Sequence, residues 1–378
     1  MKKYILSIAI LFVLLLASAI FLPYLFKDRI IESVRTEANE SLKANLNFNP
    51  DIGINIFKSF PNLNLTFKNL TLISKDSVFQ NDTFFSTDKL EASFDLMTFY
   101  QDQKYIFRSI NLEKPKLHLE IVNDSSYNWD LVKNTTSESS DEEESLNFEL
   151  EKVNITNGAF DYLDTKSNID VKVVGIAHES SGNFNTENFV LSSETSAAEV
   201  LVISDKVAYL NNWAIKQSGD IEIDLANSKY TLPKNNLNIN GLDAFLDGFI
   251  QLQEEDILFD LATNSKSPDL NKFLTLIPAI YTSDFGSMQT KGSGKLNATF
   301  KGKYGANSFP AYDLKLLVDN GWFKYPDLSL PAEDINLDLH VFSLDGNTDR
   351  TVIDIPQLHF KLAEDPFDVK LNAQDIFG

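Results

Sequence analysis

Residues 153–173 read VNITNGAFDYLDTKSNIDVKV, and residues 317–341 read LVDNGWFKYPDLSLPAEDINLDLHV. Both stretches contain the pattern Asn-Gly-x-Phe-x-Tyr-x-Asp, which begins at Asn157 in the first copy and at Asn320 in the second. Each copy then ends in an apolar residue at every second position: Ile169, Val171, Val173 and Leu337, Leu339, Val341. Repetition over such a distance is typical of chains built by adding modules. We therefore expect an elongated surface rather than a compact enzyme.

The same alternation continues through most of the chain from Ile52 onward. A period of two is typical of antiparallel β-strands that have one buried or greasy face and one wet face. The clearest runs are Leu63/Leu65/Phe67, Leu117/Leu119/Ile121, Phe148/Leu150, Ile221/Ile223/Leu225, Leu237/Ile239, Leu296/Ala298/Phe300, Leu358/Phe360/Leu362 and Val369/Leu371/Ala373. Pairs with the composition of tight turns separate them, namely Asn157-Gly158, Asn240-Gly241, Asn320-Gly321 and Asp345-Gly346. The sequence predicts a mainly β fold with many antiparallel strands and few short helices.

The N-terminus predicts a membrane segment at residues 1–27. Lys2 and Lys3 precede an uncharged run from Tyr4 to Phe26, which as a helix would be roughly 34 Å long and could cross a bilayer. The leading lysines favour a cytoplasmic N-terminus. The alternative is a cleaved signal peptide, because Ala17-Ser18-Ala19 fits a cleavage site. In both cases the rest of the chain is exported.

Two further segments have helical patterns. Residues 28–50 predict an amphipathic helix over Asp28–Leu46, with apolar residues at every fourth position. This helix either closes the entrance of the sheet or simply packs on the first strands. Residues 268–278 predict two helical turns, capped by Ser267 or Asp269 and ended by Pro278.

The remaining organisation follows from composition. Residues 133–147 include the acidic stretch NTTSESSDEEE and predict a disordered loop. This loop separates a first β module at 51–132 from repeated β modules at 148–378. The last residues follow directly on a strand, so we expect the chain to be the front part of a longer protein, or to pair with something at its end.

Composition excludes several classes of function. The formal net charge of −21 disfavours nucleic-acid binding, and the absence of cysteine removes disulfides and thiolate sites. The histidines at 118, 178, 340 and 359 form no zinc-binding pair, and the catalytic motifs of the common enzyme classes are missing. We expect no catalytic residues, no metal and no cofactor. Tyr127 and Trp129 either stack on a ligand or cover a sheet edge.

Several segments, in order along the chain, carry a resemblance to a known family. After the predicted anchor come Phe-Pro-Asn-Leu-Asn-Leu at 60–65, Lys-Pro-Lys-Leu-His-Leu at 114–119, Asn-Trp-Asp-Leu at 128–131 and the repeated Asn-Gly phrase. Together they resemble the AsmA-like proteins of Gram-negative cell envelopes. The chain departs from the commoner form of that pattern in having Ser125-Ser126-Tyr127 where a glycine precedes the Asn-Trp pair.

The resemblance implies a single-pass inner-membrane anchor followed by a periplasmic, elongated, twisted sheet that is rolled into a groove. Such proteins resemble bridge-like lipid transfer proteins, so the implied partners are phospholipids, the inner membrane and outer-membrane components, without catalysis. The groove lining would be generic apolar side chains: Leu63, Leu65, Phe67, Leu117, Leu119, Ile121, Ile221, Ile223, Leu225, Leu337, Leu339, Val341, Leu358, Phe360 and Leu362. The alternative is a structural or assembly factor for outer-membrane proteins with a closed core. Alternation taken by itself favours that closed β-sandwich.

Overall fold

The computed structural model describes residues 31–32, 35–36, 39–55, 62–79, 82–95, 98, 106–123, 126–131, 149–184, 186–254, 256–276, 288–305, 308–325 and 329–375. These residues form nineteen strands and little helix, which confirms the mainly β prediction. The chain divides into two compact units, residues 1–169 and 170–378. The predicted anchor at 1–27 and the acidic loop at 133–147 lie outside the described residues. Among the described residues, no helix has the length and hydrophobicity needed to cross a membrane.

Unit 1 is built on the long strands β3 and β4. Its strands are β1 (Ala44–Asn47), β2 (Gly53–Asn55), β3 (Asn62–Ser74), β4 (Thr83–Asp95), β5 (Ile106–Glu113), β6 (Lys116–Asn123), β7 (Ser126–Tyr127) and β8 (Glu149–Asp164). β3 pairs antiparallel with β1, β2 and β4, and β4 pairs antiparallel with β5 and β6.

β8 departs from the predicted antiparallel pattern, because it pairs parallel with both β5 and β6. Two antiparallel strands can be joined by a tight turn, whereas parallel strands need a long connection. The chain from residue 128 to residue 148 provides that length. The pairing places β8 in unit 1, which runs to residue 169.

β5 and β6 run end to end along β8. Between them, Pro115 has no N–H to donate, and Lys114 adopts a positive φ of 49°. The alignment nevertheless continues, because the Lys114 N–H donates to the Thr156 carbonyl and the Ala159 N–H donates to the Pro115 carbonyl. The Lys-Pro dipeptide is therefore an irregularity within one continuous line of strand that lies between β4 and β8.

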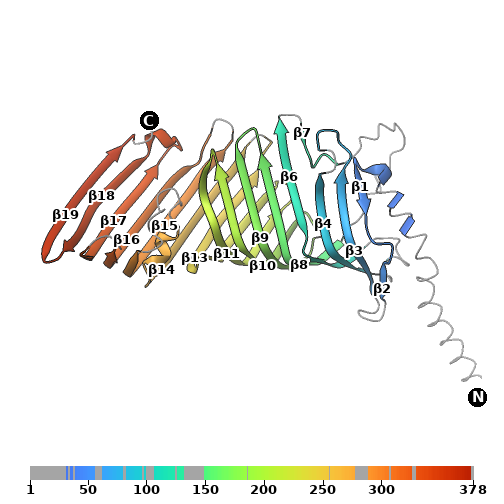
Figure 1. Ribbon diagram of the computed structural model, residues 1–378, viewed down its shortest axis with the longest axis horizontal. Coiled ribbons are helices and arrows are strands. Elements are labelled where there is room, and N and C mark those ends of the chain that lie inside the picture. Colours follow the sequence, from blue (N-terminus) through green and yellow to red (C-terminus); the bar gives the residue numbers. More distant parts are fainter. Residues whose placement is uncertain are drawn as a thin grey trace, which may run out of the picture. The chain divides into compact units, whose positions relative to one another are not determined.

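Unit 2 is an antiparallel meander in which each strand pairs with the next along the chain (Figure 1). The strands are β9 (Ile169–Gly182), β10 (Asn188–Ser204), β11 (Val207–Asp224), β12 (Lys229–Ile239), β13 (Leu242–Leu252), β14 (Ile257–Ser267), β15 (Gln289–Tyr304), β16 (Ala311–Lys324), β17 (Ala332–Ser343), β18 (Val352–Leu362) and β19 (Asp365–Gln374). The helix predicted at 268–278 is the short α4 (Asn271–Leu274). A 3₁₀ turn, η2 (Thr348–Arg350), precedes β18.

The sequence predicted turns at the two Asn-Gly pairs of the repeated phrase. In the structure both pairs lie inside strands, in β8 and β16. Asn157 and Asn320 have φ values of 55° and 50°, and the β16–β17 register shifts on both sides of Gly321. Asparagine and glycine tolerate the left-handed region, which suits a β-bulge as well as a turn. The Asn240-Gly241 pair does form the turn between β12 and β13, with positive φ at both residues.

The N-terminal segment is shorter as a helix than predicted. Residues 31–32, 35–36 and 39–41 are helical, but β1 begins at Ala44. Pairing of β1 with Thr71–Ser74 of β3 replaces helical bonding there, and the Asn39 side chain accepts a hydrogen bond from the Leu46 N–H at 2.8 Å. Tertiary pairing thus overrides the helical periodicity of residues 44–47.

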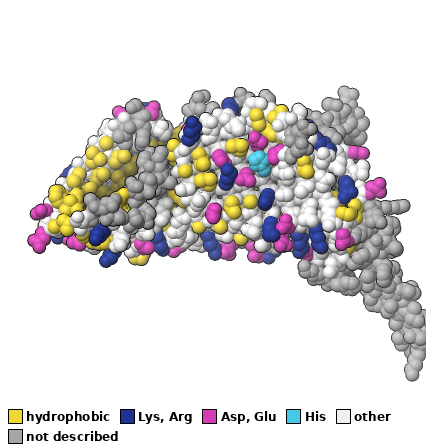
Figure 2. All heavy atoms as spheres, viewed as in Figure 1, with side chains coloured by type: hydrophobic (Ala, Val, Ile, Leu, Met, Phe, Trp, Pro, Cys, Tyr) yellow, Lys and Arg dark blue, Asp and Glu magenta, His cyan; other side chains and the backbone are white. Residues whose placement is uncertain are grey.

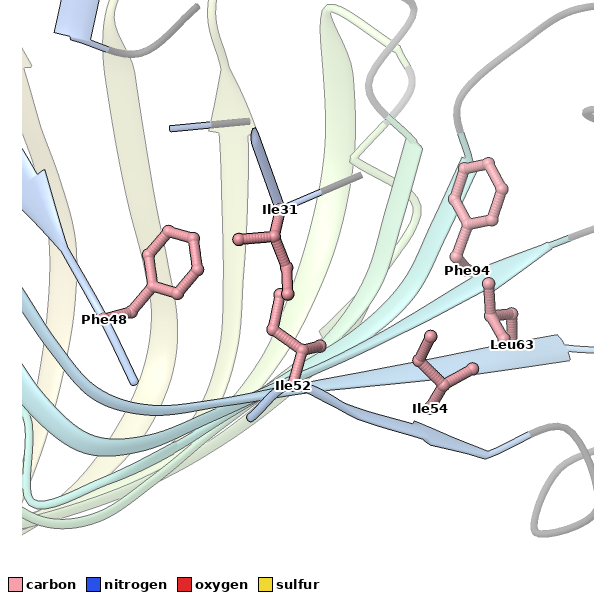
Figure 3. Close-up of a cluster of buried hydrophobic side chains, with 6 residues drawn as sticks. All are labelled: Ile31, Phe48, Ile52, Ile54, Leu63 and Phe94. Carbon is pink, nitrogen blue, oxygen red and sulfur yellow. The ribbon is translucent and has the colours of Figure 1, made fainter. Parts of the chain in front are cut away.

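The core of unit 1 lies between this N-terminal segment and β3–β4. Ile31 points toward Phe48 and Ile52, and Ile54, Leu63 and Phe94 complete the cluster (Figure 3). The described part of the helix therefore packs on the first strands, which was one of its two predicted roles.

Candidate functional site

One face of the unit 2 sheet carries apolar side chains in rows that cross from strand to strand. Leu296 of β15 is paired with Leu316 of β16, and Leu316 is paired with Leu339 of β17. Directly paired residues in antiparallel strands project from the same face. The three leucines therefore form one row that runs across the strands.

Other rows repeat this arrangement on the same face. They are Phe189–Ile223–Tyr230–Ile250–Phe259, Leu261–Phe300–Tyr312, Ala298–Leu314–Val341–Ile353–Ala373 and Val318–Leu337–Leu358–Val369. Figure 2 shows hydrophobic side chains gathered over the strands nearest the C-terminus. We call this surface of unit 2 the apolar face.

The lining residues predicted in unit 2 fall on the apolar face. Ile221 and Ile223 lie in β11, Leu337, Leu339 and Val341 in β17, and Leu358 and Phe360 in β18; all are half-buried. Phe360 stacks on Phe367 of β19 with ring centroids 5.2 Å apart. Leu225, just after β11, and Leu362, at the end of β18, are exposed at the sheet margins.

The lining residues predicted in unit 1 divide into two groups. Leu63 is only 8% exposed, and Leu65 and Phe67 pack against the same buried cluster. The second group, Leu117, Leu119 and Ile121, follows β6 and is half-buried; these residues pair with Phe160, Tyr162 and Asp164 of β8. Leu63 therefore belongs to the buried core of unit 1, and Leu65 and Phe67 are partly buried beside it.

α4 covers one part of the apolar face. Leu270 and Phe273 belong to a buried cluster with Leu242 and Val318, and Leu296, Leu316 and Leu337 pack against it. The Phe273 ring lies over Gly294 of β15, where any larger residue would collide with the ring. Few backbone bonds hold this short helix, so its position depends on these side-chain contacts.

A hydrogen-bonded polar stripe interrupts the apolar face on β9 to β12. The His178 ring contacts the Thr195 hydroxyl at 2.8 Å and the Ser180 hydroxyl at 2.9 Å. Ser193 follows on the same face of β10, at 3.3 Å from the Gln217 side chain, which donates to Asn235 at 2.7 Å. Burial lowers the pKa of His178, because the surroundings penalise the imidazolium form.

Sequence reasoning missed this stripe. Its only signal is the placement of polar residues at positions where the alternation predicts apolar ones, as at Ser193 and Thr195 in β10. Such small polar side chains also occur on exposed faces, so their burial could be seen only once the register was known.

The opposite face of the unit 2 sheet is polar. A hollow of about 760 Å³ there is lined by Phe245 as well as by charged and amide side chains, among them Lys216, Asp243, Asn264 and Lys295. Lys216 is paired with Glu194 at 2.7 Å. The charged side chains therefore gather on this face of the sheet, which also carries single exposed apolar residues such as Val190 and Phe245.

Tyr127 and Trp129 of unit 1 lie side by side, with ring centroids 5.2 Å apart, and both are partly exposed. The adjacent Asn128 is buried and hydrogen-bonded to β6. The two aromatic residues therefore flank an asparagine whose hydrogen bonds to β6 fix the turn.

Comparison with known proteins gives a family. The family model of the AsmA family matches residues 1–300. Searches of the curated proteins and of the solved structures found no match. The matched region covers unit 1 and the part of unit 2 up to β15, which is more than half of the chain, and the chain belongs to the AsmA family.

Proposed function

We propose that this protein binds phospholipid acyl chains on the apolar face and conducts them between the inner and outer membranes without catalysis. The N-terminal segment would anchor it in the inner membrane, with the two β units in the periplasm. The observation that carries the proposal is the continuity of the apolar rows across consecutive strands of unit 2.

Continuity is what a lipid-conducting surface requires. Each methylene sheltered from water contributes about 0.8 kcal/mol, so an acyl chain gains similar stabilisation at each position along the rows. No single position needs to recognise a defined chemical group. A generic aliphatic lining is therefore sufficient for the proposed function.

The exposed side chains of β19 also support the proposal that the apolar face binds a ligand. Phe367, Val369 and Leu371 of β19 all project from this face, and each is more than two-fifths exposed. Contiguous exposed apolar patches on soluble domains mark surfaces that bind something. β19 therefore offers accessible hydrophobic area next to the more covered rows of β15–β17.

The two faces allow a matched test. Leu316 lies on the apolar face, whereas its neighbour Leu317 pairs with Lys295 and Asp338 on the polar face and is 43% exposed. The 378-residue chain would be purified in detergent, and its bound phospholipid would be quantified by native mass spectrometry and lipid extraction. We expect Leu316→Asp to reduce bound lipid at least fivefold and Leu317→Asp to leave it unchanged.

Leu316 packs against the buried cluster under α4, so Leu316→Asp could unfold the protein. A second pair of variants at exposed positions avoids this ambiguity. Val369 on the apolar face and Val190 on the polar face are both exposed, so aspartate should be tolerated at either position. Val369→Asp should reduce lipid and Val190→Asp should not. Wild-type protein that is folded and lipid-free, or equal lipid in both members of each pair, would contradict the proposal and favour a protein-binding scaffold.

A further inference from the structure

A histidine and two carboxylates meet on the outer part of unit 1. His118 and Glu120 are two residues apart in β6, so their side chains project from the same face, opposite to Leu117 and Leu119. Asp82 immediately precedes β4, whose Phe85 pairs with Leu117. The three side chains are between about one-fifth and one-third exposed, which leaves them accessible from solvent.

Both carboxylates approach the same nitrogen of the imidazole. His118 Nε2 lies 3.7 Å from an Asp82 oxygen and 3.8 Å from a Glu120 oxygen. These separations are too long for hydrogen bonds. Zinc bonds to nitrogen and oxygen are about 2.0–2.2 Å, which by tetrahedral geometry puts two ligands about 3.4 Å apart. The three ligand atoms all lie within 4.8 Å of one another, so small side-chain rotations would complete the coordination.

A buried asparagine organises all three ligands. Asn128 is 2% exposed, and its amide nitrogen donates both to the Asp82 carboxylate at 3.1 Å and to the His118 carbonyl at 3.0 Å. Its side-chain oxygen accepts from the Glu120 N–H at 3.0 Å, and its own N–H donates to the Glu120 carbonyl. A hydrogen-bond partner of a ligating carboxylate, as Asn128 is of Asp82, fixes its orientation and is worth 10- to 100-fold in metal affinity where measured. The bonds from Asn128 to the backbone of His118 and Glu120 hold β6 beside Asp82.

The charges also favour a cation. Among the described residues, neither Asp82 nor Glu120 forms an ion pair with a lysine or arginine. One imidazole and two carboxylates therefore present a net negative, mixed nitrogen and oxygen ligand set. Imidazole selects zinc and similar transition metals over calcium and magnesium, which prefer oxygen ligands only.

We propose that Asp82, His118 and Glu120 bind a divalent transition-metal ion, with Zn²⁺ as the probe, and that Asn128 positions them. The bound ion would join the start of β4 to the middle of β6 beside the Asn128-Trp129 turn. This site is separate from the apolar face and does not depend on lipid binding.

The test uses the 378-residue chain in detergent, stripped with a chelator and titrated with ZnCl₂ against a fluorescent zinc indicator. We expect one Zn²⁺ per chain, with affinity reduced at least tenfold by His118→Ala and by Asp82→Asn. His359→Ala is the matched control, because His359 contacts the Asp368 carboxylate at 2.8 Å but belongs to no group of three metal-ligating side chains among the described residues, and it should not change the affinity. Zinc should also raise the melting temperature of the wild type, as any ligand of the folded state does, but not that of His118→Ala.

X-ray absorption at the zinc edge gives an independent readout and should show one imidazole nitrogen with carboxylate oxygens. Circular dichroism would verify that each variant is folded; the partial exposure of His118 makes its replacement tolerable. Zinc binding that is unaffected by His118→Ala, or that occurs only weakly at several sites, would overturn the proposal.

Discussion

The ring of Phe273 in α4 lies directly over Gly294 of β15, and a β-carbon added to Gly294 would stand 2.5 Å from a ring carbon. This contact seats the short helix on the apolar face. We predict that Gly294→Ala displaces the ring and destabilises unit 2 by about 1–3 kcal/mol, as overpacking of a core does. Displacement should also increase the binding of an apolar fluorescent dye, because rows under α4 become accessible.

A double-mutant cycle checks that the effect passes through this contact. In a Phe273→Ala background the ring is gone, so adding Gly294→Ala should cost little more than a few tenths of a kcal/mol. Additive losses in the two variants, measured by urea unfolding, would show that Gly294 is required for another reason.

The second prediction concerns the stability contributed by Asn235, which belongs to the polar stripe. Its side chain is fully buried, donates to the Asp220 carbonyl at 2.8 Å and accepts from Gln217. Asn235→Ala leaves these two partners unsatisfied, and each buried unsatisfied group costs about 1–3 kcal/mol. The exposed neighbour Asn236 projects from the other face, so Asn236→Ala should change stability by less than about 0.5 kcal/mol. Equal shifts in the urea midpoint of the two variants would contradict this assignment.

The strands and their faces could be predicted from the sequence because alternation is a local property. Leu337, Leu339 and Val341 alternate in the sequence and share one face of β17 in the structure. The bulges could not be predicted in this way. In β12, Tyr230 and Leu232 share the apolar face with Leu237 and Ile239, because an irregularity with positive φ at Lys234 reverses the phase.

Long-range pairing limited the prediction of the site. The alternation at Leu63, Leu65 and Phe67 is the same whether or not other apolar side chains pack on them. The buried Leu63 could therefore not be told from the partly buried Leu65 and Phe67 by sequence alone. The approach of Asp82 to His118 was equally invisible, because only the β4–β6 pairing brings them together. The parallel alignment of β8 likewise depends on strands that are separated by a long connection.

Burial of His178 predicts a pH dependence of stability. Its pKa in the folded state lies below the ordinary value of about 6.5, so the folded protein resists protonation while the unfolded chain accepts a proton. Stability is therefore unaffected well above pH 6.5 and falls as the pH drops through 6.5 toward the folded pKa, by at most about 1.4 kcal/mol per pH unit. The stability difference between wild type and His178→Gln should change between pH 7.5 and 5.5. A difference that is constant over this range would show that the histidine does not titrate differently in the two states.

The repeated Asn-Gly phrase gives the last prediction, at Asn320. Its φ of 50° lies in the left-handed region, which costs an ordinary residue about 1–2 kcal/mol, and its N–H points at the Asn336 side chain at 3.3 Å. Asn320→Gly should be nearly neutral, because glycine adopts this conformation freely, whereas Asn320→Val should destabilise unit 2 by at least 1 kcal/mol. The equivalent exchanges at Asn157, with a φ of 55°, should follow the same order in unit 1. Equal urea midpoints for the valine and glycine variants would show that the left-handed backbone conformation is not the reason for asparagine at this position. The resemblance between the two copies would then need another structural cause.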